Sequence, residues 1–242
     1  IPNAAWRLVW ALSTLKDGSE RVLIDGFYDD VRPPTASQVA LLDALPGDEA
    51  AEKVLYDVSE FAGGITGDEW RKAVFSPTCT INGLIAGYQG EGAMAIIPRR
   101  AIAKLDFRLV PGQDPATVLT RLERHLHVSG FEDVRVRPMH GYRPATVDPE
   151  LPFVRTVVAS AADVYEQPPV IYPIIGGSGP VDAVVNELNT PVVIGVGIDR
   201  PGASTHGPNE HIYLSEFRRG TKHMASLLER LAQSWSASGR AA

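Results

Sequence analysis

Residues 101–109, which read AIAKLDFRL, decide the fold of the first half of the chain. Apolar and other side chains alternate there with a period of two, as in a strand that buries one face. The apolar face carries Ala101, Ala103, Leu105, Phe107 and Leu109. The polar face carries Lys104, Asp106 and Arg108. The stretch therefore predicts a half-buried strand.

The neighbouring segments predict the partners of this strand. Residues 78–82 predict a second strand, with a loop or hairpin between the two. Asp114-Pro115 predicts a helix start, and an apolar stripe with a period near 3.6 extends that helix to Gly130. Val134 and Val136 alternate with arginines and predict a last strand.

Upstream, residues 2–16 predict a helix on the spacing of Leu8, Leu12 and Leu15. Helix, strand, strand, helix, strand is a ferredoxin-like βαββαβ unit that lacks its first strand, and we expect that strand to precede Ile1. Residues 17–76 read as an insertion. It is expected to hold a strand near 21–24 and helices near 36–45 and 49–62.

From about residue 144 the pattern changes to helices that alternate with apolar strands. The expected helices cover 150–165, 180–188 and 214–234, and the expected strands cover 169–175 and 191–196. Such alternation predicts an α/β layer, of which the chain holds only the C-terminal portion. The sequence thus predicts two domains, residues 1–143 and 144–242.

The composition excludes several classes of protein. A net charge of -6 without a dense basic run gives no reason to expect nucleic-acid binding. No stretch approaches 18 consecutive apolar residues, so no membrane span is expected. The single cysteine, Cys79, excludes an internal disulfide and a zinc site built from cysteines. We expect it to be a buried strand thiol in a cytoplasmic protein.

Two motifs in the second half suggest one wall of an enzyme site. Gly176 to Pro180, GGSGP, leaves an apolar strand and enters a helix, where backbone N–H groups can approach a ligand oxygen. A tight strand-to-helix turn explains the glycines equally well. His206 to Glu210, HGPNE, puts an imidazole on a loop, where metal ligands are common, although most lone loop histidines are plain surface. No second cluster of ligands with metal spacing lies upstream, so we expect half of a metal site on a fragment.

Two further hypotheses rest on single residues. Arg108 presents a rigid fork of donors that suits a carboxylate, and a solvated arginine is the alternative. Ser178 could instead be an acyl nucleophile in a triad with His206 and Asp182. Pro180 stands where the Gly-x-Ser-x-Gly elbow has its last glycine, so this serine hydrolase is the weaker hypothesis.

Read in order, the chain resembles the zinc aminoacylase and carnosinase family of metallopeptidases, which includes acetylornithine deacetylase, succinyl-diaminopimelate desuccinylase and carnosinase-type dipeptidases. The resemblance rests on five stretches: Pro2-Asn3 at the start of a helix, Pro77 to Gly87 (PTCTINGLIAG), Gly92 to Pro111 (GAMAIIPRRAIAKLDFRLVP), GGSGP and HGPNE. The long insertion and the Arg-Leu-Val-Pro run look most like the carnosinase-type branch.

The resemblance implies a lid, residues 1–143, that makes a homodimer, and the C-terminal part of an α/β zinc-peptidase domain, residues 144–242. In such enzymes two divalent ions, usually zinc with manganese or cobalt as alternatives, activate a water that cleaves a dipeptide or N-acyl amino acid. The family pattern makes His206 a metal ligand. It makes Arg108 the grip on the substrate's free carboxylate, and Gly177 and Ser178 partners of the substrate.

Two departures limit what the chain can do alone. The family's other metal ligands lie N-terminal to Ile1, and catalytic zinc typically takes three protein ligands. Ala95 stands where the family often has Thr or Asn. We therefore expect this chain alone to be inactive, to hold no catalytic metal tightly and to need the missing N-terminal part. The alternative is a dimerisation or binding module without catalysis.

Overall fold

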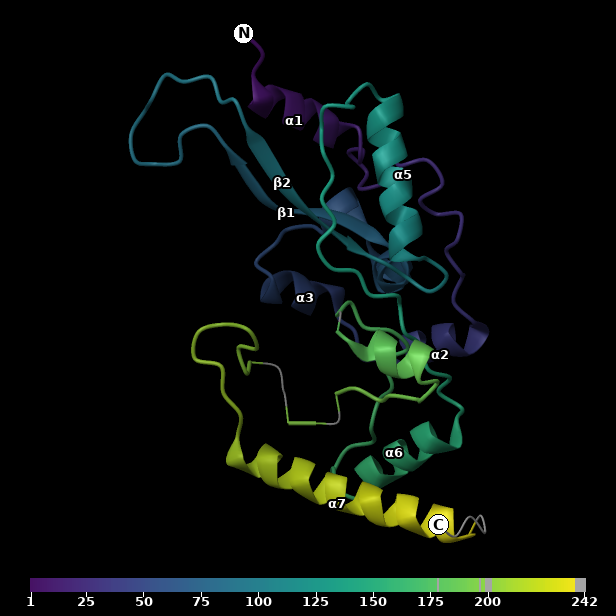
Figure 1. Cartoon of the computed structure of the whole chain (residues 1–242). Helices are drawn as coiled ribbons and strands as arrows, with labels where there is room; N and C mark the ends of the chain where they lie inside the picture. Colours follow the sequence, from purple (N-terminus) through teal and green to yellow (C-terminus); the bar gives the residue numbers. More distant parts are fainter. Residues whose placement is uncertain (178, 196, 199–201, 238–242) are drawn as a thin grey trace. The chain divides into compact units, whose positions relative to one another are not determined.

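The computed structural model describes residues 1–177, 179–195, 197–198 and 202–237. The chain divides into two compact units (Figure 1). Unit 1 comprises Ile1–Ala145 and Ile174–Asp182, and unit 2 comprises Thr146–Pro173 and Ala183–Ala242. The assignment of residues 1–143 to a lid and 144–242 to a catalytic part stays a prediction, because a packing unit does not reveal its role.

Unit 1 is built on an antiparallel hairpin of β1, Thr78–Ala86, and β2, Ala101–Arg108. Cys79 pairs with Phe107, and the register shifts between Ile81 and Gly83. A bulge of this kind places an extra residue on one strand. The predicted strand at 101–109 is confirmed, and β1 continues beyond the predicted residue 82 to Ala86.

Unit 1 also contains two helices beside the hairpin: α1, Ala4–Ser13, and α5, Pro115–Val128 (Figure 1). The Asn3 side chain accepts from two backbone N–H groups of the first turn of α1, and Asp114 does the same for α5. These side chains satisfy N–H groups that a helix leaves without partners. Both predicted helices are confirmed, and α1 is shorter than predicted because Asn3 is its N-cap.

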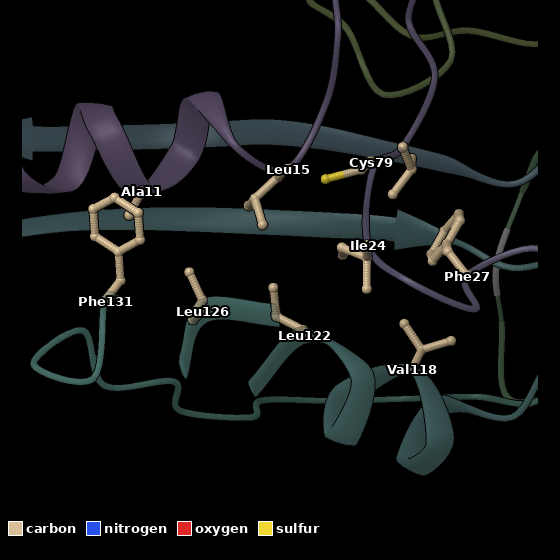
Figure 2. Packing of buried hydrophobic residues seen from close by; sticks show 10 residues of the cluster. Ala11, Leu15, Ile24, Phe27, Cys79, Val118, Leu122, Leu126 and Phe131 are labelled. Atoms are coloured by element: carbon tan, nitrogen blue, oxygen red, sulfur yellow. The ribbon is translucent and has the colours of Figure 1, made fainter. Parts of the chain in front are cut away.

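The core of unit 1 lies where α1, α5, β1 and the segment 22–27 meet. Figure 2 shows their side chains pointing toward one another. The buried members are Ala11, Leu15, Val22, Ile24, Phe27, Cys79, Val118, Leu122, Leu126 and Phe131. The prediction that Cys79 is a buried thiol is confirmed, and burial raises the pKa of that thiol.

The insertion is helical but less regular than predicted. It contains α2, Ala36–Ala44, α3, Glu49–Leu55, and α4, Gly67–Lys72, with short 3-10 turns at Ala62–Gly64 and Ala73–Phe75. The predicted helix at 49–62 is too long. It ends because Asp57 is left-handed (φ 53) and the Val58 N–H donates to the Lys53 carbonyl, a Schellman-type end. The predicted strand at 21–24 is wrong, since only an isolated bridge joins Lys16 and Val22.

Unit 2 is built on α6, Pro152–Ala162, and the long α7, Leu214–Ala237. The two predicted helices at 150–165 and 214–234 are confirmed. The predicted helix at 180–188 is reduced to a π-helical turn, η3, at Ala183–Glu187. No helix in the described part of the chain, α7 included, has the length and apolar character needed to cross a bilayer.

Three predicted strands are wrong: residues 134–137, 169–175 and the described part of 191–196 are not in strands, and Val196 lies outside the described residues. Val134 and Val136 nonetheless pack against the core while Arg135 and Arg137 are exposed, so the predicted alternation holds. A strand needs a neighbouring backbone to pair with. Apart from the isolated bridge between Lys16 and Val22, the described residues supply one for β1 and β2 alone. The described residues thus form a mixed fold of helices with one small sheet, and the predicted ferredoxin-like unit and α/β layer are not confirmed.

Candidate functional site

Arg108 lies at the end of β2, on the polar face that the alternation predicts. Its Nε donates to Asp106 Oδ2 at 2.6 Å, and its side chain is 46% exposed. Residues two apart share a strand face, so the ion pair follows from the local sequence. Asp106 thereby fixes one edge of the guanidinium, a contact that the shared face would have allowed us to predict.

The glycine-rich turn lies against this arginine. The Gly176 carbonyl oxygen is 3.5 Å from Arg108 Nη1, at the long limit of a hydrogen bond, although 68 residues separate the two in sequence. Gly177, the next residue, is exposed, and Ser178 lies outside the described residues. Unit 1 therefore brings together two of the sequence-predicted substrate-binding elements, Arg108 and the start of the GGSGP turn.

Arg143 contacts the C-terminal end of the Ile174–Asp182 segment, which begins just before the glycine-rich turn. The Arg143 backbone N–H donates to Asp182 Oδ2 at 3.0 Å, and Arg143 Nε lies 3.2 Å from Asp182 Oδ1. The Asp182 side chain is only 17% exposed, so the pair is partly shielded from water. Sequence analysis missed this clamp, because the two residues belong to different predicted domains and have no motif spacing.

His206 lies on an exposed loop of unit 2. It has a left-handed backbone (φ 62), as do Ser204 (φ 56) and Asn209 (φ 60). Non-glycine residues in this region cost of order 1 kcal/mol or more each, and such strain gathers at functional sites. The His211 N–H donates to the Ala203 carbonyl at 3.1 Å and closes the loop. The surrounding structure thus holds a strained backbone around the predicted metal ligand.

The described residues do not by themselves make a metal site. No group of three or more His, Cys, Asp and Glu side chains that could hold an ion is found among them. A catalytic zinc ion typically takes three protein ligands, whereas HGPNE offers one imidazole. His206 belongs to unit 2 and Arg108 to unit 1. A dinuclear centre would therefore need ligands from outside this set.

A histidine in a helix without metal-ligand spacing is expected at the surface, but His223 of α7 is buried. Its exposed fraction is 0%, and its Nε2 is 2.8 Å from Ser160 Oγ of α6. Leu227, one helical turn further on, is also buried. The i, i+4 spacing of His223 and Leu227 on a helix was the signal that could have revealed this burial.

A model of peptidase family M20/M25/M40 matches residues 16–230. The chain belongs to this family. The family match spans both units, and the resemblance to the carnosinase-type metallopeptidases is confirmed at this level.

Two curated relatives and a solved structure show how much of the family fold the chain covers. The Beta-Ala-His dipeptidase of Homo sapiens is 26% identical over 93% of this chain and 45% of its own length. The Cys-Gly metallodipeptidase of Saccharomyces cerevisiae is 25% identical over 94% and 48%. The M20 family metallo-carboxypeptidase of Sulfolobus solfataricus is 32% identical over 95% of this chain and 52% of that chain, with a TM-score of 0.85. The chain thus spans about half the length of the curated relatives it matches.

Proposed function

We propose that this chain is part of a metal-dependent hydrolase that cleaves the amide bond of dipeptides or N-acyl amino acids with a metal-activated water. The observation that carries the proposal is the contact between Arg108 and the Gly176 turn in a chain of the M20 family. The names of the similar dipeptidases support an amide substrate. We also propose a cytoplasmic location, because a lone buried cysteine suits a reducing compartment.

Arg108 is proposed to bind the substrate's free carboxylate. An arginine matches a carboxylate with a planar fork of donors and stays charged at any working pH. Asp106 holds the Nε edge, which orients the remaining part of the guanidinium. Gly177 and Ser178 are proposed to hydrogen-bond the same substrate from the turn that begins at Gly176.

His206 is proposed to ligate one of two divalent ions, zinc or alternatively manganese or cobalt. The ions would supply a water with a lowered pKa. The remaining ligands are proposed to come from the part of the family fold that this chain does not cover. This chain alone is accordingly proposed to be inactive and to hold no catalytic metal tightly.

Activity assays test this proposal. The 242-residue chain with added zinc is expected to give no turnover of β-Ala-His or Cys-Gly, whereas a longer chain that includes the upstream half of the family fold is expected to cleave a dipeptide. Loss of that activity with a chelator would support the metal. Turnover by the 242-residue chain alone, or chelator-resistant hydrolysis by the longer one, would contradict the proposal.

A matched pair of variants in the longer chain tests the role of Arg108. Arg108→Lys keeps the charge but removes the fork, so KM is expected to rise by about tenfold or more with a smaller change in kcat. Arg135→Lys, at an exposed arginine of unit 1, is the control and is expected to leave both constants unchanged. Equal effects of the two variants would argue against a substrate contact at Arg108.

The alternative of a dimerisation module is supported by the surface of α1. Trp6 and Trp10 are 58% and 54% exposed, and their rings stack with centroids 5.9 Å apart. Large exposed aromatic groups are typical of protein interfaces. A homodimer in sedimentation experiments that dissociates in Trp6→Ser/Trp10→Ser would support this surface. A monomer at all concentrations would count against it.

The serine hydrolase stays the less favoured alternative. Its acid, Asp182, already has both carboxylate oxygens within hydrogen-bonding reach of Arg143. That partner gives Asp182 a structural role in fixing the 174–182 segment to unit 1. Chelator resistance combined with loss of activity in Ser178→Ala would revive the hypothesis.

A further inference from the structure

A cluster of two buried polar side chains and one half-buried tyrosine lies in unit 2, where neither the family motifs nor the proposed chemistry uses it. It consists of Ser160 on α6, Tyr165 just after α6 and His223 on α7. Ser160 and His223 have no exposed surface. Buried polar groups cost free energy unless they are hydrogen-bonded, so a cluster of this kind calls for a physical explanation.

The contacts around His223 Nε2 favour a proton on that ring nitrogen. Ser160 Oγ lies 2.8 Å from the Val157 carbonyl and 2.8 Å from His223 Nε2. A carbonyl only accepts, so the single hydroxyl hydrogen of Ser160 goes to Val157. In that arrangement His223 Nε2–H donates to Ser160 Oγ, and the Val157 carbonyl lies 3.4 Å from the same nitrogen. The other nitrogen, Nδ1, is buried and has no hydrogen-bond partner among the described residues.

The His223 ring in turn supports Tyr165. The two rings meet edge-to-face, with centroids 5.6 Å apart and an interplanar angle of 87°. Such pairs are favourable beyond the area they bury. Burial raises the pKa of the Tyr165 phenol, which keeps its hydrogen available. The hydroxyl donates to the Gly197 carbonyl at 2.9 Å.

The backbone at residues 197–198 is therefore held at two successive positions. Gly197 has a left-handed backbone (φ 47), and a Cβ there would come within 2.3 Å of the Tyr165 hydroxyl oxygen. Ile198 packs on α7 so closely that a Cβ on Gly220 would come within 2.7 Å of its Cγ2. This anchored pair precedes the closed loop from Ala203 to His211.

We infer that Tyr165 and His223 are positioning residues, which hold the Gly197 backbone and thereby order the loop that carries His206. The inference rests on the proposed function only in so far as His206 is a metal ligand. The ordering of the loop can be measured without any metal. Ser204, His206 and Asn209 have left-handed backbones in that loop, a conformation that persists only where the surrounding structure holds it.

Residue-resolved amide exchange of the 242-residue chain tests the inference. Tyr165→Phe removes the hydroxyl but keeps the ring, and is expected to speed exchange at the Gly207 and His211 amides by about tenfold. Exchange in α6 and α7 is expected to change by less than about twofold. Tyr172→Phe, at an exposed tyrosine of the same unit, is the control and is expected to change neither.

Gly220→Ala separates positioning from a merely structural role. Alanine favours a helix over glycine, so this variant is expected to slow exchange in α7 while its new Cβ displaces Ile198 and speeds exchange in the loop. The His206 ring signals in carbon-13 spectra are expected to shift in Tyr165→Phe and Gly220→Ala but not in Tyr172→Phe. Unchanged loop exchange, or a parallel rise in α6, α7 and the loop, would overturn the inference.

Long-range nitrogen-15 spectra of the His223 ring test the first step, and the Nε2–H form is expected. An Nδ1–H form would overturn the hydrogen-bond chain. Zinc titration of the His206 ring signals, carried out on the longer chain that includes the upstream half of the family fold, separates the two proposals. If zinc leaves those signals unshifted, the proposed ligand role fails, and the exchange results still decide whether Tyr165 positions the loop.

Discussion

Unit 1 and unit 2 differ in whether their predicted strands find backbone hydrogen-bond partners. In unit 1 both strands of the hairpin are present, and ten buried residues close a core against them. In unit 2 the two helices α6 and α7 form as predicted, while 169–175 and the described part of 191–196 stay outside any strand. A helix satisfies its backbone within its own segment, whereas a strand needs a neighbour. Among the described residues, helices therefore form in both units, whereas strands form only in the hairpin, where each strand has a neighbour.

The largest expected effect comes from supplying those partners. In a longer chain that includes the upstream half of the family fold, we expect residues 134–137 and 191–195 to pair with strands supplied by the added segment. We expect amide exchange in both segments to slow by a hundredfold or more, while β1 and β2 change little. Hydrogen exchange on the two lengths of chain measures this. Equal exchange in both would break the comparison.

Gly112→Ala is expected to have the largest effect of a single substitution on unit 1. Gly112 has φ +100, and a Cβ there would come within 1.9 Å of the Asp30 carbonyl oxygen. Left-handed strain and the backbone overlap together are expected to cost about 3 kcal/mol of unfolding free energy. Urea unfolding with exchange read separately in β2 and α6 measures it.

The control for Gly112→Ala is Gly18→Ala, where no atom lies within 4 Å of the added Cβ. It is expected to change stability by a few tenths of a kcal/mol. If Gly112→Ala lowered the protection from amide exchange in α6 as much as in β2, the two units would not unfold separately, which would contradict the contrast between them.

Gln113→Ala is expected to cost somewhat less. Gln113 is buried, its Nε2 donates to the Phe27 carbonyl at 2.8 Å, and its Oε1 accepts from the Val110 N–H at 3.0 Å. Truncation leaves a buried donor and a buried acceptor without partners, at a cost of about 2 kcal/mol. Chemical denaturation reports it, with Gln233→Ala at an exposed position of α7 as the control. A cost below about 0.5 kcal/mol would mean that water replaces both contacts.

Asp133→Asn is expected to have the smallest effect, visible only in acid. Hydrogen bonds from Arg7, at 3.0 Å from Nε and 2.6 Å from Nη2, lower the pKa of the Asp133 carboxyl. Its contribution to stability is therefore full above the ordinary aspartate value of about 3.9, and is lost as the pH falls through the lower folded value. The midpoint temperature of thermal unfolding, measured from about pH 5 to about pH 2, is expected to fall less steeply with decreasing pH in the variant than in the unchanged chain. Identical slopes would contradict this.

Local chemistry made much of unit 1 predictable. Asp114-Pro115 fixed a helix start, the alternation at 101–109 fixed a strand, and its period put Asp106 beside Arg108. The contact of Arg108 with Gly176 and the clamp of Arg143 on Asp182 depend on tertiary packing, which has no local pattern. The absence of a strand at 169–175 could not be predicted from the sequence, because an apolar pattern indicates burial and does not show whether a neighbouring strand is present.

The burial of Cys79 has a practical consequence. A sole thiol that is shielded from solvent and reluctant to ionise reacts slowly with maleimides and iodoacetamides. A second cysteine can be introduced by Ser234→Cys at an exposed position of α7, or by Gln89→Cys between the two strands. A fluorophore or nitroxide reagent would then label the introduced thiol in strong preference to Cys79. The natural sequence therefore already serves as a background for site-directed labelling, with no need to remove its own sulfur.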